Sequence, residues 1–394
     1  MKATFHFHVL IKPFGPVCNL SCDYCYYLGK KDLFPKQEQF RMTEETLDLF
    51  TRQYIEAQPP GTTEVNFAWQ GGEPTLMGID FYKRAITLQK RYIRPGMQIS
   101  NAIQTNGIHL DDEWGQFLHD NQFLVGISID GPEELHDHYR KDRHGQGSFR
   151  KVMHGIELLK RHSCQWNTLT VIHKYNSHHP EKIYRFLKRV GSTFLQFIPL
   201  IEKQNSGGVT DRSVVPYAFG RFLFDVFRLW LRRDIGSIFV QQFDVLLGMI
   251  MKEPISSLCV YARSCGQNTI LEHNGDLFSC DHFVFPEHRL GNIMKIPLIK
   301  MMDSEKQKSF GNSKHNSLPE NCKECGYLSM CHGGCPAHRN VFVNNNVPGL
   351  NYLCDGYKYF LKGALPKFQA MARALDAYKP ASEYKHFMPT QRKK

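Results

Sequence analysis

The sequence lacks the features of a membrane-spanning or secreted protein. None of its apolar runs approaches the length needed to cross a bilayer. The N-terminus, MKATFHFHVLIKPF, alternates polar and apolar residues, whereas a secretion signal carries an unbroken apolar core. Repeats and low-complexity segments are also missing from the chain. We therefore expect a soluble, cytoplasmic protein, whose 394 residues suffice for one large domain and a smaller one.

Concentrated positive charge is missing as well, although the formal net charge is +11. The basic residues are spread along the chain, and the one dense run is the terminal QRKK. No helix-turn-helix pattern and no basic recognition helix accompany them. The sequence therefore predicts neither a nucleic-acid partner nor a membrane partner.

Cysteine, in contrast, is abundant, and its placement is informative. Twelve cysteines could form a disulfide framework, but such frameworks are typical of short chains with an export signal. Only Cys164 lies outside the cysteine groups, and we interpret it as a small core residue. In a reducing compartment, grouped cysteines predict metal or iron–sulfur ligands.

Strand-like and helix-like segments alternate through the first ~230 residues, as expected of βα units around a parallel sheet. The expected strands are Phe7–Ile11, Val65–Trp69, Gln98–Ile103, Leu124–Ile129, Asn167–Ile172 and Phe194–Pro199. The expected helices are Thr43–Ala57, Phe81–Tyr92, Phe149–Arg161, Glu181–Val190 and a long amphipathic stretch, Tyr217–Ile250. About six repeats favour an α/β fold, a partial (β/α)6 TIM-like barrel, over a doubly wound sheet, although the pattern is compatible with both.

Distinctive motifs follow five of the expected strands. The first strand leads into CNLSCDYC, the second into QGGEPT, the third into QTNG, the fourth into SIDGP and the sixth into the loop at Ile201. Parallel strands place such loops on one face of a barrel, where active sites are built. We therefore expect these motifs to converge on one site.

The first motif contains Cys18, Cys22 and Cys25 at C-x3-C-x2-C spacing. Three thiolates on a [4Fe–4S] cluster leave one iron without a protein ligand, so that this iron can chelate a small molecule. The alternative is a zinc knuckle with a distant fourth ligand. Zinc sites usually combine C-x2-C pairs, so the spacing favours the cluster.

Eight more thiols lie in the C-terminal third, enough for two fully ligated clusters. They are Cys259, Cys265, Cys280, Cys322, Cys325, Cys331, Cys335 and Cys354. Short segments rich in Cys, Gly, Asn and His surround them, which is typical of a small domain held together by metal. Taken alone, these thiols could equally form a pair of structural zinc sites.

CNLSCDYC resembles the signature of the radical S-adenosylmethionine (AdoMet) superfamily, C-x3-C-x-aromatic-C, with Tyr24 as the aromatic residue. QGGEPT resembles the superfamily's glycine-rich motif, in which Gly72 lets the backbone approach the amino group of AdoMet. The resemblance implies that AdoMet binds the open iron and is cleaved to a 5′-deoxyadenosyl radical after one-electron reduction. It further implies that Ser128 bonds the ribose, Arg140 holds the carboxylate and Ile201 lines the adenine pocket. From the residues alone, these three could be a strand-end hydroxyl, a surface base and a core residue.

The eight later thiols resemble the SPASM extension of radical AdoMet enzymes that modify peptides and proteins. In that pattern one auxiliary cluster is held by Cys259, Cys265, Cys280 and Cys335. The other is held by Cys322, Cys325, Cys331 and Cys354. Spacing alone would group Cys322–Cys335 together, so this division is implied by the resemblance. The expected cofactors are thus three [4Fe–4S] clusters and AdoMet.

Several further segments resemble the anaerobic sulfatase-maturating enzymes, among them IKPFG, AWQGGEPT, FLVGISIDGP, LEHNGDLFSCDHFV, RLGNI and PGLNYLC. The resemblance implies oxidation of a Cys or Ser side chain of a sulfatase, within a C/S-x-P-x-R-like motif, to Cα-formylglycine. It implies two partners, the sulfatase polypeptide and a low-potential electron donor, a ferredoxin or flavodoxin. The sequence leaves open whether the target is Cys, Ser or both.

Asp281 directly follows the expected ligand Cys280 and is the candidate catalytic base. Converting a Cβ radical to an aldehyde or thioaldehyde requires loss of one electron and of the O–H or S–H proton. An auxiliary cluster can accept the electron, and a neighbouring carboxylate can accept the proton. The alternative is that Asp281 merely supports the cluster as a hydrogen-bonding neighbour.

The expected domains are a radical AdoMet barrel at 1–234, a helical linker at 235–258, a SPASM-type domain at 259–365 and a C-terminal helix and tail at 366–394. Three other functions stay open on the sequence alone. A maturase of the same superfamily could form a thioether or other crosslink, a radical enzyme could modify RNA, and an iron–sulfur regulator could bind nucleic acid without catalysis.

Overall fold

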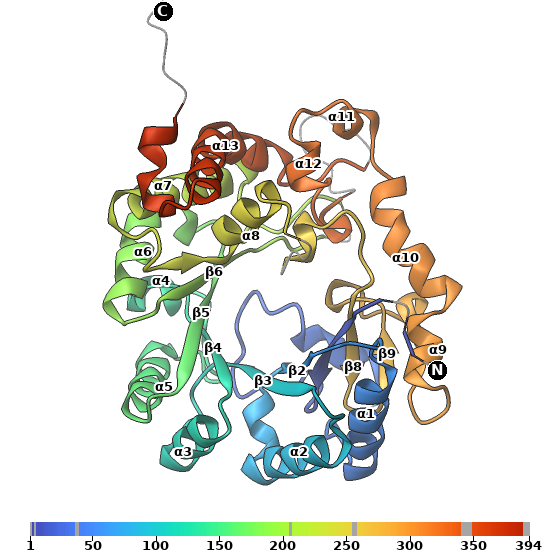
Figure 1. Ribbon diagram of the computed structural model, residues 1–394. Coiled ribbons are helices and arrows are strands. Elements are labelled where there is room, and N and C mark those ends of the chain that lie inside the picture. Colours follow the sequence, from blue (N-terminus) through green and yellow to red (C-terminus); the bar gives the residue numbers. More distant parts are fainter. Residues whose placement is uncertain are drawn as a thin grey trace, which may run out of the picture. The chain divides into compact units, whose positions relative to one another are not determined.

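The computed structural model of the chain describes residues 2–3, 5–35, 39–204, 207–253, 258–339 and 349–388. The chain divides into two compact units, each assembled from segments that are far apart in the sequence (Figure 1). The first unit comprises Met1–Ile129, His136–Trp166 and Ser264–Ser313. The second comprises Asp130–Leu135, Asn167–Arg263 and Lys314–Lys394.

The first unit is built on strands in the order β10–β9–β8–β1–β2–β3–β4. Their bounds are β1 (His8–Lys12), β2 (Glu64–Trp69), β3 (Gln98–Thr105), β4 (Leu124–Ser128), β8 (Asn268–Glu272), β9 (Asp276–Phe278) and β10 (Arg289–Asn292). Neighbouring strands from β8 to β4 are parallel, whereas β9 is antiparallel to both β8 and β10. Ile11 pairs with Trp69, and Trp69 pairs with Ile103, so the carboxyl ends of β1–β3 meet at one edge.

Helices of the first unit cover its sheet. Their bounds are α1 (Glu44–Ala57), α2 (Ile79–Tyr92), α3 (Asp112–Asp120), α5 (Phe149–Arg161) and α9 (Leu298–Met302), with 3-10 turns η1 (Leu28–Leu33), η2 (Pro74–Met77), η5 (Asp281–Phe283) and η6 (Pro286–His288). Helices α4 (Glu133–His136) and α10 (Glu305–Asn316) cross from one unit to the other. Figure 1 shows α1, α2 and α3 along one side of strands β2–β4.

Helix α1 illustrates why these segments fold as the sequence predicts. The Thr43 side chain accepts a hydrogen bond from the Thr46 backbone N–H at 3.1 Å, which caps the helix. Phe50 and Tyr54, four residues apart, present their rings to Phe67 of β2, with centroids 5.9 and 5.2 Å away. The helical period thus buries one aromatic face against the sheet.

The second unit contains strands β5 (Gln165–Ile172, from Asn167 on), β6 (Phe194–Pro199) and β7 (Phe239–Val240), which are parallel in that order. Its helices are α6 (Pro180–Arg189), α7 (Pro216–Arg233), α8 (Gln241–Ile250), α11 (Glu320–Lys323), α12 (Leu328–Cys331) and α13 (Cys354–Asp376). Its 3-10 turns are η3 (Asn176–His178), η4 (Cys259–Tyr261), η7 (Pro336–His338) and η8 (Ala381–Phe387).

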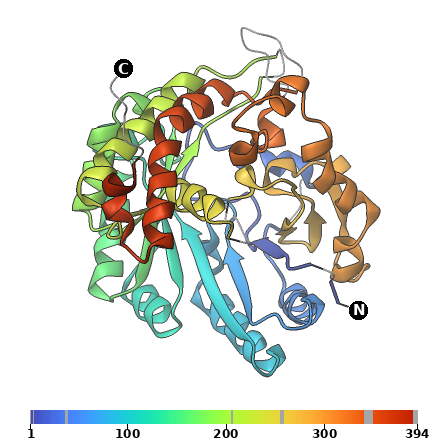
Figure 2. The ribbon, with the colours of Figure 1, turned by 45° about the horizontal axis from the view of Figure 1, so that its top comes forward.

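Helices α7 and α13 of the second unit pack against each other, and Figure 2 shows α13 in red. Glycines allow the two backbones to approach closely, because a Cβ at Gly220 would lie 2.2 Å from the Gly356 carbonyl oxygen. Aromatic rings fill the space beside this crossing, with Phe227 and Phe368 centroids 4.8 Å apart. The contact joins the end of the chain to the segment that follows β6.

The six expected strands and the first four expected helices are all present, with ends displaced by at most two residues. The prediction of one long helix at Tyr217–Ile250 is wrong, because α7 ends at Arg233 and β7 separates it from α8. Gly236, at a φ of +81°, turns the chain there, and Phe239 pairs with Phe194 of β6. Local periodicity could not reveal a strand of two residues that exists only through its partner.

The region after Leu258 contributes to both units. Residues 264–313 belong to the first unit, where β8 pairs with β1 from His8–Asn268 to Lys12–Glu272. The C-terminal end of the described chain contains η8, in which Tyr384 is buried, and residues 389–394 lie outside the described part. Among the described helices, none has both the length and the apolar character needed to span a membrane.

The glycine contact between α7 and α13 leads to a stability prediction. Gly220→Ala should lower the free energy of unfolding by roughly 1–3 kcal/mol, because the added methyl group forces the two helix backbones apart. Urea unfolding followed by circular dichroism measures the change. Gly29→Ala is the control, since a Cβ there meets no atom within 4 Å. An unchanged unfolding midpoint in Gly220→Ala would contradict the prediction, because it would show that the two helices can move apart with little loss of free energy.

Candidate functional site

The cysteine loop, from Gly15 to Cys25, follows β1 and contains almost no regular structure, so its backbone depends on partners elsewhere in the first unit. The QGGEPT turn after β2 supplies the first set. The Gly72 N–H donates to the Gly15 carbonyl at 2.8 Å, and the Glu73 N–H donates to the Val17 carbonyl at 2.9 Å. A Cβ at Gly72 would lie 2.1 Å from the Val17 oxygen, so only glycine permits this approach.

The segment around Arg140 supplies the second set of partners. The Ser21 N–H donates to the Lys141 carbonyl at 2.8 Å, and the Asp23 N–H donates to the Tyr139 carbonyl at 3.0 Å. The Arg143 guanidinium donates to the Cys18 carbonyl at 2.5 Å. The cysteine loop is therefore held between the end of β2 and the segment that follows α4.

The three thiols of this loop lie close enough to influence one another. Burial, together with the negative charges of Glu73, Cys22 and Cys25, raises the pKa of Cys18 to about 12. A metal or cluster that bound here would have to displace these protons, since thiolates are the ligands. The donor set of three neighbouring sulfurs fits a cluster with one open position.

Glu73 joins the ends of β2 and β3, a role that the sequence analysis missed. Its carboxylate is buried and accepts hydrogen bonds from the Thr75 backbone at 3.1 Å, the Thr105 hydroxyl at 2.7 Å and the Asn106 backbone at 2.8 Å. The Thr75 hydroxyl adds a fourth bond at 2.7 Å. The signal in the sequence was its position directly after Gly72, within a motif already singled out.

Of the five residues expected to contact AdoMet, the structure places four in the first unit. Tyr24 is buried, and the Arg140 guanidinium lies 5.5 Å from the centre of its ring. Ser128 is the last residue of β4 and is also buried, and Gly72 adjoins the cysteine loop. Ile201 follows β6 and belongs to the second unit. Tyr24, Gly72 and Arg140 are thus grouped at the loop.

Asp281 lies beside the residue that follows Cys25. The Tyr26 hydroxyl donates to Asp281 Oδ2 at 2.5 Å, and Lys12 Nζ lies 2.9 Å from Asp281 Oδ1. Burial by itself raises the pKa of Asp281, but the Lys12 ammonium and the Tyr26 hydrogen bond outweigh it and lower that pKa below its ordinary value. The sequence analysis missed Lys12 and Tyr26, because neither contact is local in the chain.

A small hydrophobic cluster explains why these segments meet. Tyr27, Ile270, Phe278 and Val284 pack together, with Cys25 at the edge of the cluster. The Lys30 ammonium donates to the Val284 carbonyl at 2.8 Å. Burial of these side chains brings the segment after Cys25 against the segment after Cys280.

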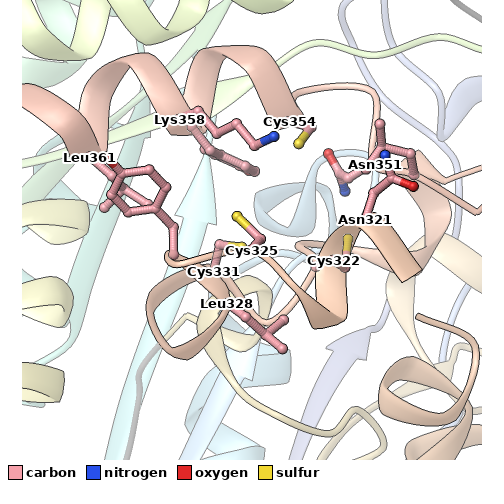
Figure 3. A pocket seen from close by; sticks show the side chains of 13 residues that line it. Asn321, Cys322, Cys325, Leu328, Cys331, Asn351, Cys354, Lys358 and Leu361 are labelled. Carbon is pink, nitrogen blue, oxygen red and sulfur yellow. The ribbon is translucent and has the colours of Figure 1, made fainter. Parts of the chain in front are cut away.

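Four cysteines of the second unit line one pocket. They are Cys322, Cys325, Cys331 and Cys354, and Figure 3 shows them around a common space. Burial raises the pKa of Cys354 to about 11, and burial together with the charge of Cys331 raises the pKa of Cys322. The pocket excludes Cys335 from its lining, which differs from the grouping that spacing alone suggests. Four thiols fit a fully ligated cluster.

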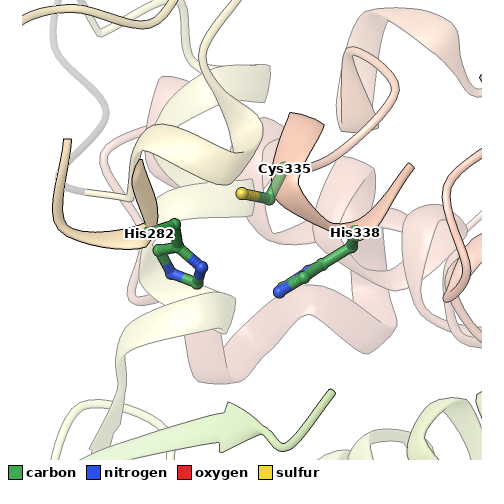
Figure 4. Close-up of side chains that lie close together, drawn as sticks. All are labelled: His282, Cys335 and His338. Atoms are coloured by element: carbon green, nitrogen blue, oxygen red, sulfur yellow. The ribbon is translucent and has the colours of Figure 1, made fainter. Parts of the chain in front are cut away.

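The remaining four expected ligands divide between the units. Cys265 and Cys280 belong to the first, and Cys259 and Cys335 belong to the second. The buried Lys314 ammonium donates to the carbonyls of Cys259 and Val260 at 2.7 and 3.0 Å, which holds the turn that carries Cys259. Cys335 directly precedes η7, which ends at His338 (Figure 4).

Comparison with known proteins decides the family. The family model for the Radical SAM superfamily matches residues 13–187, and the model for an iron–sulfur cluster-binding domain, SPASM, matches residues 259–326. A serine-type anaerobic sulfatase-maturating enzyme of Bacteroides thetaiotaomicron is 43% identical, over 95% of both chains. This chain belongs to the anaerobic sulfatase-maturating enzymes. It is therefore a radical AdoMet enzyme, which excludes the non-catalytic regulator.

Other members of the family and a solved structure agree. The cysteine-type enzyme of Clostridium perfringens is 34% identical, over 91% of this chain and 96% of its own. The structure of native anSMEcpe with bound AdoMet is similar at a TM-score of 0.83 and 32% identity, over 93% of this chain and 99% of the other. The same enzyme with AdoMet and the Cp18Cys peptide gives a TM-score of 0.84. The predicted partial TIM-like barrel with a SPASM extension is thus confirmed.

The four-thiol pocket leads to a prediction about iron content. Cys354→Ala should remove about four iron atoms per chain after anaerobic reconstitution, since the pocket would hold one four-iron cluster. Iron and acid-labile sulfide assays measure the loss. Cys164→Ala should leave the iron content unchanged, because the buried Cys164 thiol contacts the Gly115 carbonyl instead. Equal iron in the two variants would show that Cys354 holds no cluster.

Proposed function

We propose that this sulfatase-maturating enzyme oxidises a serine side chain of a sulfatase to Cα-formylglycine, and that it accepts cysteine as well. The observation that carries the proposal is the hydrogen bond between Tyr26, next to Cys25, and Asp281, next to Cys280. This hydrogen bond supports the view that the candidate base, Asp281, lies both beside the loop that would hold AdoMet and beside Cys280, a proposed ligand of an auxiliary cluster. The identity to serine-type relatives, 43% and 38%, exceeds that to cysteine-type relatives, 34% and 35%, which supports serine as the main target.

The proposed enzyme contains three [4Fe–4S] clusters. Cys18, Cys22 and Cys25 would hold the open cluster, and the four thiols of the described pocket would hold one auxiliary cluster. The other auxiliary cluster would be held by Cys259, Cys265, Cys280 and Cys335. The proposed domain boundaries are those expected from the sequence, at residues 234, 258 and 365. So many thiols also support a reducing compartment, the cytoplasm.

The residues that would bind AdoMet are Tyr24, Gly72, Ser128, Arg140 and Ile201. Gly72 and Arg140 would hold its amino and carboxylate groups, Ser128 its ribose and Ile201 its adenine. The position of Arg140 over the Tyr24 ring supports this assignment, because a buried guanidinium needs an anion or an aromatic face as partner. The hydrogen bonds of Gly72 to the cysteine loop support its place beside the open iron.

When bound, AdoMet and the clusters supply hydrogen-atom abstraction at the substrate Cβ and accept the electron that the substrate gives up. Asp281 takes the remaining proton, from the hydroxyl of serine or the thiol of cysteine, so that one hydrogen atom, one electron and one proton leave the side chain. Serine then gives the aldehyde directly, whereas cysteine gives a thioaldehyde, which water hydrolyses to the aldehyde with release of hydrogen sulfide. Lys12 Nζ and the Tyr26 hydroxyl hold the two carboxylate oxygens and so fix the direction of the base.

The proposed partners are a sulfatase polypeptide with a C/S-x-P-x-R-like motif and a low-potential electron donor, a ferredoxin or flavodoxin. Reduction of a [4Fe–4S] cluster at low potential requires such a donor. The relatives named as sulfatase-maturating enzymes support the first partner.

The first test is turnover of matched peptides. Anaerobically reconstituted protein with reductant and AdoMet should convert an S-x-P-x-R peptide to the aldehyde, with 5′-deoxyadenosine formed alongside. Mass spectrometry follows both products, a C-x-P-x-R peptide reports the second specificity, and an A-x-P-x-R peptide is the control. Turnover of the cysteine peptide alone would overturn the serine assignment. Aldehyde from neither peptide, in protein with full clusters, would overturn the proposed function.

Asp281→Asn tests the base. The amide cannot take the substrate proton, so aldehyde formation should fall at least about 10²-fold while AdoMet cleavage and iron content persist. Product ratios by mass spectrometry and an iron assay measure this separation. Asp80→Asn is the control, because the Asp80 side chain is fully exposed beside Lys83. Wild-type aldehyde formation in Asp281→Asn would exclude the base role, and loss of iron would show that Asp281 supports the cluster instead.

A further inference from the structure

The QTNG motif after β3 is the one distinctive strand-end motif of the first unit without an assigned task. It folds into a tight turn whose polar groups are satisfied by neighbours. The Thr105 hydroxyl donates to Glu73 Oε1 at 2.7 Å and accepts from the Gly107 N–H at 3.0 Å. The Asn106 backbone N–H donates to Glu73 Oε2 at 2.8 Å. The turn is therefore fixed to the end of β2.

The Asn106 side chain is buried, with 6% of its surface exposed, and its orientation is determined by its partners. Its Oδ1 accepts from the Ile108 N–H at 3.0 Å, which leaves the NH2 group pointing the other way. That NH2 group lies 2.7 Å from Asn19 Oδ1 and 3.8 Å from Cys18 Sγ. The amide thus reaches across from β3 into the cysteine loop and directs one N–H at the Cys18 sulfur.

Cys18 Sγ receives a second N–H, from the Leu20 backbone at 3.3 Å. Hydrogen bonds to ligating sulfurs withdraw electron density and stabilise the reduced form of an iron–sulfur cluster, which raises its potential. The buried Glu73 carboxylate lies close enough to Cys18 for its negative charge to lower the potential of a cluster bound there. The neutral NH2 group of Asn106, which points at the same sulfur, offsets this lowering of the potential without adding a charge.

We propose that Asn106 is a positioning residue for the open cluster, whose hydrogen bond to Cys18 raises the cluster's reduction potential and so eases delivery of the first electron. The inference rests on the proposed assignment of Cys18 as a cluster ligand. It gives QTNG a task in the electron-transfer step, separate from binding of AdoMet.

The test is a redox titration of the holoenzyme, followed by electron paramagnetic resonance of the reduced-cluster signal that changes on adding AdoMet. Asn106→Asp keeps the size of the side chain and the acceptor for Ile108 but removes the NH2 group. At a fixed solution potential, the ratio of reduced to oxidised open cluster should fall about tenfold, which is a shift of about 59 mV for a one-electron couple. Asn106→Leu removes the donor without adding charge and should lower the ratio about threefold.

Asn121→Asp is the matched control. It removes a side-chain NH2 group of the same kind, but that group donates to the Phe117 carbonyl at 2.8 Å, so the potential should not change. An unchanged potential in both Asn106 variants would overturn the inference. A shift in Asn106→Asp with none in Asn106→Leu would show an effect of charge alone and would overturn it too.

If neither variant retains the cluster, the hydrogen bond is tested in wild-type protein instead. This protein is labelled with ¹⁵N in the asparagine side-chain amides. A ¹⁵N coupling on the AdoMet-sensitive signal that persists in Asn19→Ser supports the hydrogen bond, and its absence overturns it. Failure of the proposed function can be distinguished from failure of this inference, because wild-type protein would then show no AdoMet-sensitive signal at all.

Discussion

The cysteine loop of the first unit must hold three thiols together although it has almost no secondary structure of its own. Unpaired backbone groups in such a loop would each cost free energy, and the loop would not keep one shape. The ends of β2 and β3 and the segment around Arg140 supply the missing partners. The parallel register of β1–β3 matters because it delivers those donors at a single edge. The geometry of the thiols therefore depends on several chain segments rather than on the loop.

The same constraint operates on the candidate base. Pairing of β8 with β1 adds strands of the segment Ser264–Ser313 to the sheet of the first unit. The cluster of Tyr27, Ile270, Phe278 and Val284 then buries apolar surface between the two cysteine-bearing segments. Asp281 meets Lys12 and Tyr26 as a consequence. An ion pair with one buried partner, as Lys12 is here, contributes little net stability, because the charges lose hydration when they are removed from water. Its use here is to hold a carboxylate in one direction.

Much of this arrangement could be predicted from local sequence. Period-two and period-3.6 patterns placed six strands and four helices to within two residues, because those elements bury one face each. The pattern failed at 234–240, where a two-residue strand owes its existence to β6. It also could not show that β8 continues the sheet beyond β1, since nothing near Asn268 in the sequence specifies its partner.

The sequence by itself indicated the family and the candidate cluster ligands, because thiol spacing and strand-end motifs are short-range features. Spacing alone would have grouped Cys335 with Cys322, Cys325 and Cys331, whereas the family resemblance implied Cys354 in its place, and the tertiary structure brings Cys354 to their pocket. Only the tertiary structure revealed Glu73, Asn106 and Lys12 as the groups that hold the loop and the candidate base. Their hydrogen bonds and ion pairs join residues 33 to 269 positions apart (Glu73 to Asn106, Lys12 to Asp281). Contacts over such separations follow from how the strands pair and which surfaces are buried, and local patterns contain neither.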